Sequence, residues 1–515
     1  MHAVSYSLWK LLGGENASEA QHAALDVILS RLRAKNILHP FGFYSHGFGD
    51  SAATAIIARD IRWIQHQLLR DDISNDNNND VIDSTIHTID PILYESLPFD
   101  YPELKNIAIV HEGTFLTPPT STSSVRFMPQ SCIESRFQLV TPISWKENSS
   151  SKIGTMTGIW PSQAIQNESG VNAEQLQEMK RLQPVAIILA GTGEQGFDRR
   201  RQLVSLPLAR SNIASLIIES PYYGSRRPIG QVASKLRSLT DLPLLGRMTI
   251  EETRSIVKWL RKRQGVSLDK NSKNCSSDKH GAIVLAGVSM GGLHAAMSAS
   301  LLPQSWKDCG VASWLGPPSG AAVFTRGRLA FATDFDALAN DVEGPVSSRA
   351  LDHNIEKLEE LLYMQPGSIT PATAVRTGEW SNQLLDDSLP SLAFSVPRSA
   401  MPTASDTAAL ASFFSNVSPS ILAQTLRQAV RLLRLTDITN FAPPPRPDAS
   451  IFVTGSADQY VPRVQDTFDM WQHVREQWVG SDVRTVRGGH VTGSLFAIGS
   501  YVKTIVEVVR KLSRR

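Results

Sequence analysis

Cysteine, net charge and long apolar runs are all scarce in this chain, and each shortage excludes a class of protein. The three cysteines (Cys132, Cys275 and Cys309) are scattered and odd in number, which excludes a disulfide scaffold and a four-cysteine zinc module and favours a reducing, intracellular compartment. The 51 Lys and Arg residues nearly balance the 49 Asp and Glu residues, so we expect no nucleic-acid partner. No apolar run approaches the ~18 residues of a membrane-spanning helix, so no transmembrane segment is expected.

The first residues also lack the apolar segment and small-residue cleavage site of a secretory signal. Their basic residues are typical of a mitochondrial transit segment, but Glu19 and Asp26 are not, because such segments contain few acidic residues. A folded helix explains this region better, because Ser18 and Gln21 form a capping box. Apolar residues then recur at helical spacing, at Leu25, Ile28, Leu29 and Leu32.

Composition divides the chain into four parts. Residues 1–70 are predicted to be an N-terminal helical extension, and residues 71–104 an acidic, Asn-rich linker, because DDISNDNNND at 71–80 cannot bury apolar surface. Residues 105–317 and 440–515 are predicted to form the core, and 318–439 an insertion, a candidate lid over an acyl pocket. Phenylalanines of the insertion are expected to line that pocket or to pack a small core of their own: Phe331, Phe335, Phe394, Phe413 and Phe414.

The core shows short apolar runs that alternate with helical patterns. Residues 107–119 and 135–142 have the β-type residues of an antiparallel sheet edge, whereas the later runs are apolar on both faces, as buried parallel strands are. These later runs are 185–190, 216–219, 282–286, 311–315 and 451–453. Thr249 and Glu252 indicate a second capping box at the start of a helix. The pattern predicts an α/β fold with a mostly parallel sheet.

One motif indicates catalysis. The run 282–286 leads directly into Gly287–Gly291, a G-x-S-x-G sequence, and a helix of small residues is predicted after it. A strand that turns sharply into a helix leaves Ser289 at the apex, in the strained conformation of a nucleophile elbow, and the glycines remove Cβ atoms that would clash. A glycine-rich turn without chemistry remains the alternative.

A nucleophilic serine needs a base and an acid, expected in the chain order Ser, Asp, His. Asp458 follows the run 451–453, and His490 lies on a glycine loop after residues 483–486, so both are expected at the same sheet edge as Ser289. Asp334 and Asp336 compete for the role of the acid. The backbone N–H groups of Thr192 and Met290 are expected to form the oxyanion hole.

Two further motifs suggest other interpretations. Gly191–Gly196 is a literal G-x-G-x-x-G, and Glu219 lies near the distance of a ribose-binding acid, as in a dinucleotide-dependent oxidoreductase. Against this, arginines and Pro207 follow where a dinucleotide helix should pack on the sheet. Ser45–Asp50 resembles a His-Gly oxyanion motif, but no strand pattern precedes it, and we expect a turn between two helices.

Arginines follow two of the predicted strands. Arg199, Arg226 and Arg227 are candidate contacts for an anionic group near the scissile ester, because guanidinium binds phosphate in a bidentate manner. Ordinary solvated charges are the alternative interpretation.

Together these stretches resemble the α/β-hydrolase domain-containing protein 18 family. The resemblance lies in residues 112–119 (EGTFLTPP), 135–145 (SRFQLVTPISW), 189–201 (LAGTGEQGFDRRR), 219–228 (ESPYYGSRRP), 287–292 (GVSMGG), 457–463 (ADQYVPR) and 488–496 (GGHVTGSLF). It implies an α/β-hydrolase fold, the triad Ser289, Asp458 and His490, a glycine loop at Gly191 that does not bind a dinucleotide, and hydrolysis of lipid or other esters. A mitochondrial location is suggested for some members.

We therefore expect a lipase-like serine esterase that cleaves carboxylic esters of a lipid or small molecule through an acyl-enzyme, without metal or cofactor. Peripheral membrane contact is a further expectation. A non-catalytic scaffold with the hydrolase fold and the oxidoreductase remain the alternatives.

Overall fold

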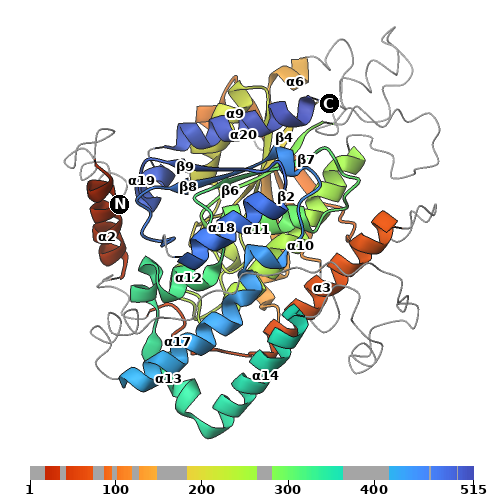
Figure 1. Ribbon diagram of the computed structural model, residues 1–515. Helices are drawn as coiled ribbons and strands as arrows, with labels where there is room; N and C mark the ends of the chain where they lie inside the picture. Colours follow the sequence, from red (N-terminus) through yellow and green to blue (C-terminus); the bar gives the residue numbers. More distant parts are fainter. Residues whose placement is uncertain are drawn as a thin grey trace.

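A mixed β-sheet forms the centre of the molecule (Figure 1). The computed structural model describes residues 18–34, 42–73, 86–95, 101–118, 127–147, 183–263, 281–363, 417–462, 465–495 and 497–514, and every structural feature given for the protein lies within them. There the sheet has nine strands in the order β1-β2-β3-β5-β4-β6-β7-β8-β9. Strands β4 to β9 run parallel, and β1, β2 and β3 add an antiparallel edge. The predicted α/β fold with a mostly parallel sheet is confirmed.

The strands coincide with the predicted runs to within a few residues. The antiparallel strands are β1 (Ile92–Glu95), β2 (Ala108–Leu116) and β3 (Glu134–Pro142). The parallel strands are β4 (Val185–Leu189), β5 (Ala214–Ile218), β6 (Ile283–Val288), β7 (Cys309–Trp314), β8 (Ser450–Gly455) and β9 (Asp482–Val486). Strands β4 and β5 are buried over their whole length, which explains their unbroken apolar sequence.

The first strand corrects the predicted linker. β1 lies inside residues 71–104, yet it pairs with β2 in antiparallel register, from Ile92 opposite Thr114 to Glu95 opposite His111. Its four residues were too short a pattern to stand out beside the acidic stretch. The sheet therefore begins earlier in the chain than the composition indicates.

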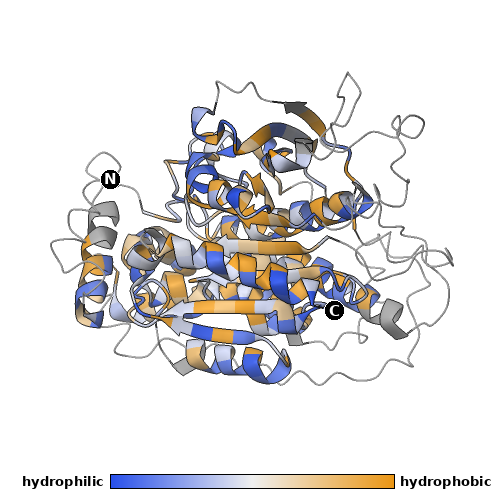
Figure 2. Ribbon diagram, turned by 90° about the horizontal axis from the view of Figure 1, so that it is seen from above, coloured by the Kyte–Doolittle hydropathy of each residue, from blue (hydrophilic) through white to orange (hydrophobic). Residues whose placement is uncertain are grey.

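Helices cover both faces of the sheet. One face packs against α10 (Asp241–Arg263), α11 (Met290–Ser300) and α18 (Gln465–Gln477), and the other against α9 (Leu206–Arg210) and α20 (Ile498–Ser513). Seen from above, the central strands are largely apolar, whereas the helices around them alternate apolar and polar stretches (Figure 2). Short helices complete the core, at α6 (Ser144–Glu147) and α8 (Asp198–Arg200).

The described part of the insertion packs closely against the N-terminal region. It contains α12 (Gly320–Thr325), α13 (Phe335–Glu343), α14 (Pro345–Tyr363) and α17 (Pro419–Leu433). Helix α14 lies beside α3 (Ala52–Ile73) (Figure 1), and Asn354 donates a hydrogen bond to Ser51 Oγ at 2.9 Å. Phe335 is fully buried in the core, whereas Phe394, Phe413 and Phe414 lie outside the described residues.

Helix α10 corrects the second predicted capping box. The helix begins at Asp241, so Thr249 and Glu252 lie in its interior and not at its start. Pro243 falls in the first turn of the helix, where its missing N–H costs no intrahelical hydrogen bond. Gly246 lies against the ring of His294, where a Cβ would be 3.1 Å from Nε2.

The N-terminal helix α2 (Glu19–Ala34) lies beside α19 (His490–Leu495) at one side of the sheet (Figure 1). Its capping box is confirmed, since Ser18 N donates to Gln21 Oε1 at 2.7 Å and Gln21 N donates to Ser18 Oγ at 3.3 Å. A turn over residues 44–48 lies between α2 and α3 in the chain, as predicted for Ser45–Asp50. None of the described helices combines the length and the apolar character needed to cross a bilayer.

Candidate active site

Ser289 lies at a strained turn between β6 and α11. Its φ of 57° and ψ of −125° are a conformation that L-residues rarely adopt. Its N–H donates to Trp314 O at 2.9 Å, which ties the turn to strand β7. A Cβ on Gly287 would lie 2.2 Å from the carbonyl carbon of Gly291, and one on Gly291 would lie 2.5 Å from Leu189 O. Both flanking glycines are thus required by backbone contact, as expected of a nucleophile elbow.

The structure brings Ser289, His490 and Asp458 into one hydrogen-bonded chain. Ser289 Oγ lies 2.8 Å from His490 Nε2, and His490 Nδ1 lies 2.8 Å from Asp458 Oδ2. The serine is half-buried, and the other two side chains are buried. An imidazole between a carboxylate and a hydroxyl is arranged to accept the hydroxyl proton.

The two loops that bear Asp458 and His490 are held by main-chain contacts. Asp458 Oδ1 accepts the N–H groups of Tyr460 and Val461 at 2.9 Å each, and this leaves Oδ2 for the imidazole. Ala457 N donates to Gly488 O at 3.0 Å, which joins the loop after β8 to the loop after β9. Gly488 has a φ of +134°, so glycine is needed there.

The competing acids both lie at the start of helix α13. Asp334 accepts the N–H of Ala337 at 3.1 Å and so caps helix α13, and Asp336 lies in the first turn of the same helix. The carboxylate beside His490 belongs to Asp458.

Two residues of the site were missed by sequence reasoning. The Tyr460 ring stacks on His490 with 4.9 Å between centroids and 23° between planes. Asp26, from helix α2, accepts the N–H groups of His490 and Val491 at 2.6 and 2.8 Å. A signal for Asp26 existed, because the spacing of His22, Leu25 and Asp26 places all three on one helix face.

The expected oxyanion donors both line the cavity next to Ser289. The N–H of Gly191 is taken by Glu194 Oε2 at 3.1 Å, whereas among the described residues those of Thr192 and Met290 have no acceptor. Met290 is the first residue of α11, so its N–H has no intrahelical partner. Both groups are therefore available to an incoming oxygen.

A cavity of about 410 Å³ opens beside Ser289 and His490. Much of its wall is apolar and comes from the N-terminal region, the core and the insertion: Phe43, Leu203, Leu242, Val323, Phe324 and Leu329. Cationic side chains also line it, among them Arg199, Lys235 and Arg328. His294 lies in the wall too, and burial lowers its pKa to about 4, so that it is neutral near pH 7.

Of the three candidate anion contacts, the structure places one at the cavity. Arg199 lines it and donates to Ser494 O at 3.2 Å. Arg227 is exposed and absent from the cavity wall, and Arg226 is buried, with 1% of its surface exposed. The predictions for Arg226 and Arg227 are therefore wrong, and so is the alternative of a solvated charge for Arg226.

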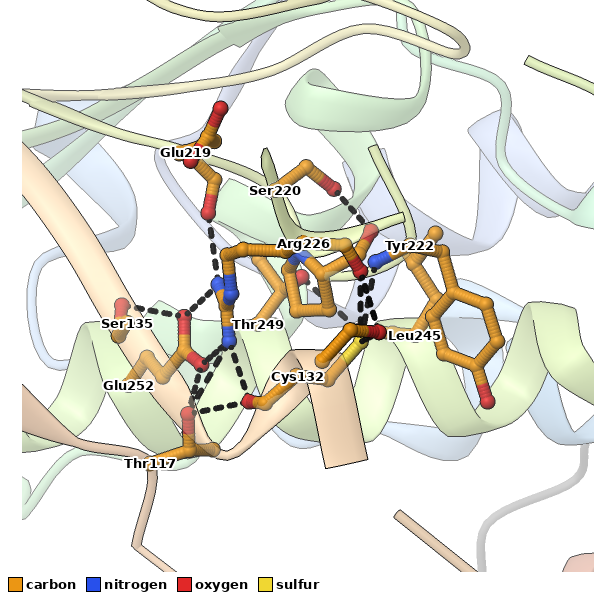
Figure 3. Close-up of polar contacts among 12 residues, drawn as sticks. Thr117, Cys132, Ser135, Glu219, Ser220, Tyr222, Arg226, Leu245, Thr249 and Glu252 are labelled. Atoms are coloured by element: carbon orange, nitrogen blue, oxygen red, sulfur yellow. Dashed lines mark hydrogen bonds and ion pairs between the residues drawn. The ribbon is translucent and has the colours of Figure 1, made fainter. Parts of the chain in front are cut away.

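Arg226 is instead the centre of a buried polar network (Figure 3). Its guanidinium pairs with both carboxylate oxygens of Glu252. It also donates to Glu219 O at 2.7 Å, Thr117 Oγ1 at 3.0 Å and Cys132 O at 2.9 Å. The arginine thus joins the loop after β5 to strand β2, the start of β3 and helix α10.

The G-x-G-x-x-G loop is also built for another purpose. The Arg200 guanidinium lies beneath it and donates to Ile188 O, Ile218 O and Gly196 O at 2.7 to 2.9 Å. It therefore ties the loop to the carboxyl ends of β4 and β5. Glu219, the expected ribose ligand, accepts hydrogen bonds from Ser225. These contacts argue against dinucleotide binding. Separately, no cluster of potential metal ligands occurs in the described part of the chain.

The family described as alpha/beta hydrolase domain containing 18 matches residues 155–511. The chain belongs to this family. The match and the fold place it among the hydrolases of the α/β-hydrolase superfamily.

Solved structures similar to the chain include two acetyl xylan esterases. The enzyme from Paenibacillus sp. R4 is 12% identical over 83% of this chain and 92% of that chain, with a TM-score of 0.38. Acetyl Xylan Esterase 1 from Thermoanaerobacterium sp. JW/SL YS485 is 10% identical over 91% and 98%, with a TM-score of 0.35. The peroxisomal alpha-beta-hydrolase Lpx1 from Saccharomyces cerevisiae is 11% identical over 83% and 91%, with a TM-score of 0.32. Likenesses this distant say nothing about the substrate.

Proposed function

We propose that the protein is a serine hydrolase that cleaves carboxylic esters through an acyl-enzyme. The observation that supports it best is the chain of two 2.8 Å contacts from Asp458 through His490 to Ser289, at the wall of a cavity. A structural serine needs neither the strained turn nor an imidazole aimed at its hydroxyl.

In the proposed reaction, His490 Nε2 takes the proton of Ser289 Oγ as Oγ attacks the acyl carbonyl carbon. The bond to the alcohol oxygen then breaks, and that oxygen takes the proton from Nε2 and leaves as the alcohol. Water attacks the acyl-serine in the same way, so that the acid is released and Ser289 regains its proton. Asp458 holds the proton on Nδ1 and thereby fixes the imidazole tautomer.

The N–H groups of Thr192 and Met290 are the proposed donors to the carbonyl oxygen as it becomes negative. One lies in the loop after strand β4 and the other opens helix α11, so both lie at the ends of neighbouring strands. Donors fixed before the reaction need no reorganisation when the charge develops.

A lipid ester is the proposed substrate class. The support for it is the apolar wall of the cavity, to which α12 and the 3-10 helix Arg328–Ala332 of the insertion contribute. The insertion is therefore the proposed acyl-binding lid. Arg199 remains the proposed contact for an anionic group of the substrate, whereas Arg226 and Arg227 do not. Peripheral membrane contact and a mitochondrial location remain predictions.

Fluorophosphonate labelling tests the proposal directly, because the probe phosphonylates an activated serine. We expect the wild-type protein to be labelled and Ser289→Ala to be unlabelled, with a loss of ester turnover of about a millionfold. Ser298→Ala is a matched control on the same helix, since Ser298 is buried and outside the cavity wall. An unlabelled wild type, or equal labelling of Ser289→Ala, would overturn the proposal. The first result would favour a non-catalytic scaffold.

A further inference from the structure

One buried carboxylate connects the N-terminal helix to both loops of the proposed triad. Asp26, on α2, has no exposed surface. Its Oδ2 accepts the N–H of His490 at 2.6 Å and that of Gln459 at 3.3 Å, and its Oδ1 accepts the N–H of Val491 at 2.8 Å. Gln459 directly follows Asp458, so Asp26 contacts the main chain next to the acid and at the base itself.

The sequence around His490 is shaped to admit this carboxylate. A Cβ on Gly489 would lie 2.6 Å from Asp26 Oδ2, so any larger residue there would push the carboxylate away. The N–H groups of His490 and Val491 belong to the first turn of α19 and have no intrahelical acceptor. Asp26 supplies that acceptor from a helix 464 residues earlier in the chain.

The charge of Asp26 is costly where it lies. Burial and the nearby Asp458 carboxylate raise its pKa to about 6, although His490 and the two N–H donors act in the opposite direction. The Asp458 carboxylate and the His490 imidazole are the charged groups that face Asp26 from the two loops. On its own helix, His22 lies near Arg487 and Glu19 is exposed. The adjacent turn contributes Arg328, whose guanidinium lies over the Phe331 ring. A buried acid that stays ionised near pH 7 therefore depends on its N–H donors.

We propose that Asp26 is a positioning residue for the hydrolase site, which fixes His490 relative to Asp458 and makes helix α2 a necessary part of the active site. The proposal rests on the proposed function. It adds a component that lies outside the 155–511 segment matched by the family. The ionised carboxylate is the better acceptor for all three N–H groups, because protonation removes the negative charge and turns one oxygen into an O–H donor.

The test compares Asp26→Asn and Asp26→Ala with Glu19→Gln, which removes an exposed carboxylate from the same helix. Reactive protein is first counted by fluorophosphonate titration, and hydrolysis of a p-nitrophenyl acyl ester is then measured per reactive site. We expect both Asp26 variants to lose about tenfold to a hundredfold in kcat with little change in KM, because Asp26 does not line the cavity. Glu19→Gln should match the wild type.

The pH profile separates positioning from a merely structural role. In the wild type, protonation of Asp26 as the pH falls through about 6 lowers kcat/KM in addition to the loss of the free catalytic base, so the acidic limb should be steeper than one decade per pH unit. In Asp26→Asn the limb should fall by one decade per unit. Gly489→Ala, which keeps the charge but displaces it, should lose kcat as Asp26→Ala does.

The outcomes are distinct. An unlabelled wild type overturns the proposed function and the role of Asp26 with it. A labelled wild type whose Asp26 variants keep kcat per reactive site and the steep acidic limb overturns the role of Asp26 alone, even if their melting temperature falls. Loss of kcat together with the shallower limb supports it.

Discussion

The buried pair of Arg226 and Glu252 makes a quantitative prediction about stability. Both side chains are almost wholly buried, and the guanidinium makes further bonds to Glu219 O, Thr117 Oγ1 and Cys132 O (Figure 3). Replacing Arg226 by Met leaves the Glu252 carboxylate without its counter-ion in the interior. Breaking such a pair costs about 3–5 kcal/mol of the free energy of unfolding.

The double variant distinguishes the charge from the shape. Arg226→Met with Glu252→Met removes both charges, so we expect it to recover most of the roughly 3–5 kcal/mol that Arg226→Met alone loses. Part of the loss should remain, since Glu219 O and Cys132 O lose a donor. Arg227→Met is the matched control at the neighbouring, exposed position and should change stability by less than about 0.5 kcal/mol.

Urea unfolding followed by circular dichroism measures these differences. The reasoning fails if Arg226→Met unfolds at the wild-type urea concentration. It fails equally if the double variant is as unstable as the sum of the two single variants, because the charges would then be uncoupled. Labelling at Ser289 should survive in the folded fraction of each variant, since Arg226 does not line the cavity.

Three other expectations concern the site and its surroundings. Gly287→Ala should abolish fluorophosphonate labelling of Ser289, because its methyl group would overlap the backbone of Gly291. Gly499→Ala is the control and should leave the labelling unchanged, because the space around its Cβ position is open. Tyr460→Phe should keep kcat near the wild-type value, because it keeps an aromatic ring stacked on His490. Tyr460→Ala removes the ring and should lower kcat about tenfold, and measuring kcat of both variants beside the wild type checks this. His294 has a pKa of about 4 in the folded protein, below its ordinary 6.5, so between these values the unfolded state binds one more proton and stability is lost as the pH falls. His294→Leu should therefore flatten the dependence of the urea midpoint on pH between 6.5 and 4. An unchanged slope would contradict the assignment.

Local sequence patterns predicted much of the fold. Buried parallel strands need apolar residues on both faces, so runs such as 185–190 were visible without any partner. The elbow at Ser289 was visible for the same reason, because its glycines answer a local backbone constraint. Asp458 and His490 followed from the rule that catalytic loops lie at the carboxyl ends of strands.

The contacts that sequence reasoning missed involve partners far apart in the chain. Asp26 looked like one more acid on an N-terminal helix, and its acceptor role appears only when α2 lies against α19. Arg226 looked like a surface cation because arginine side chains are usually exposed. Nothing in the sequence indicates that Glu252 faces Arg226. The spacing of His22, Leu25 and Asp26 indicates one face of α2, but nothing in the sequence identifies what that face contacts, and no spacing connects Arg226 with Glu252.

The order of strands in the sheet has a consequence for synthesis of the protein on the ribosome. Strand β7 pairs with β8, yet all of residues 318–439 must be made between them. Until then β7 presents an unpaired apolar edge, of the kind that invites association between nascent chains. A translation product that ends within the insertion would contain Ser289 and the unpaired edge of β7, but not His490. We therefore expect such truncated chains to aggregate or to need a chaperone.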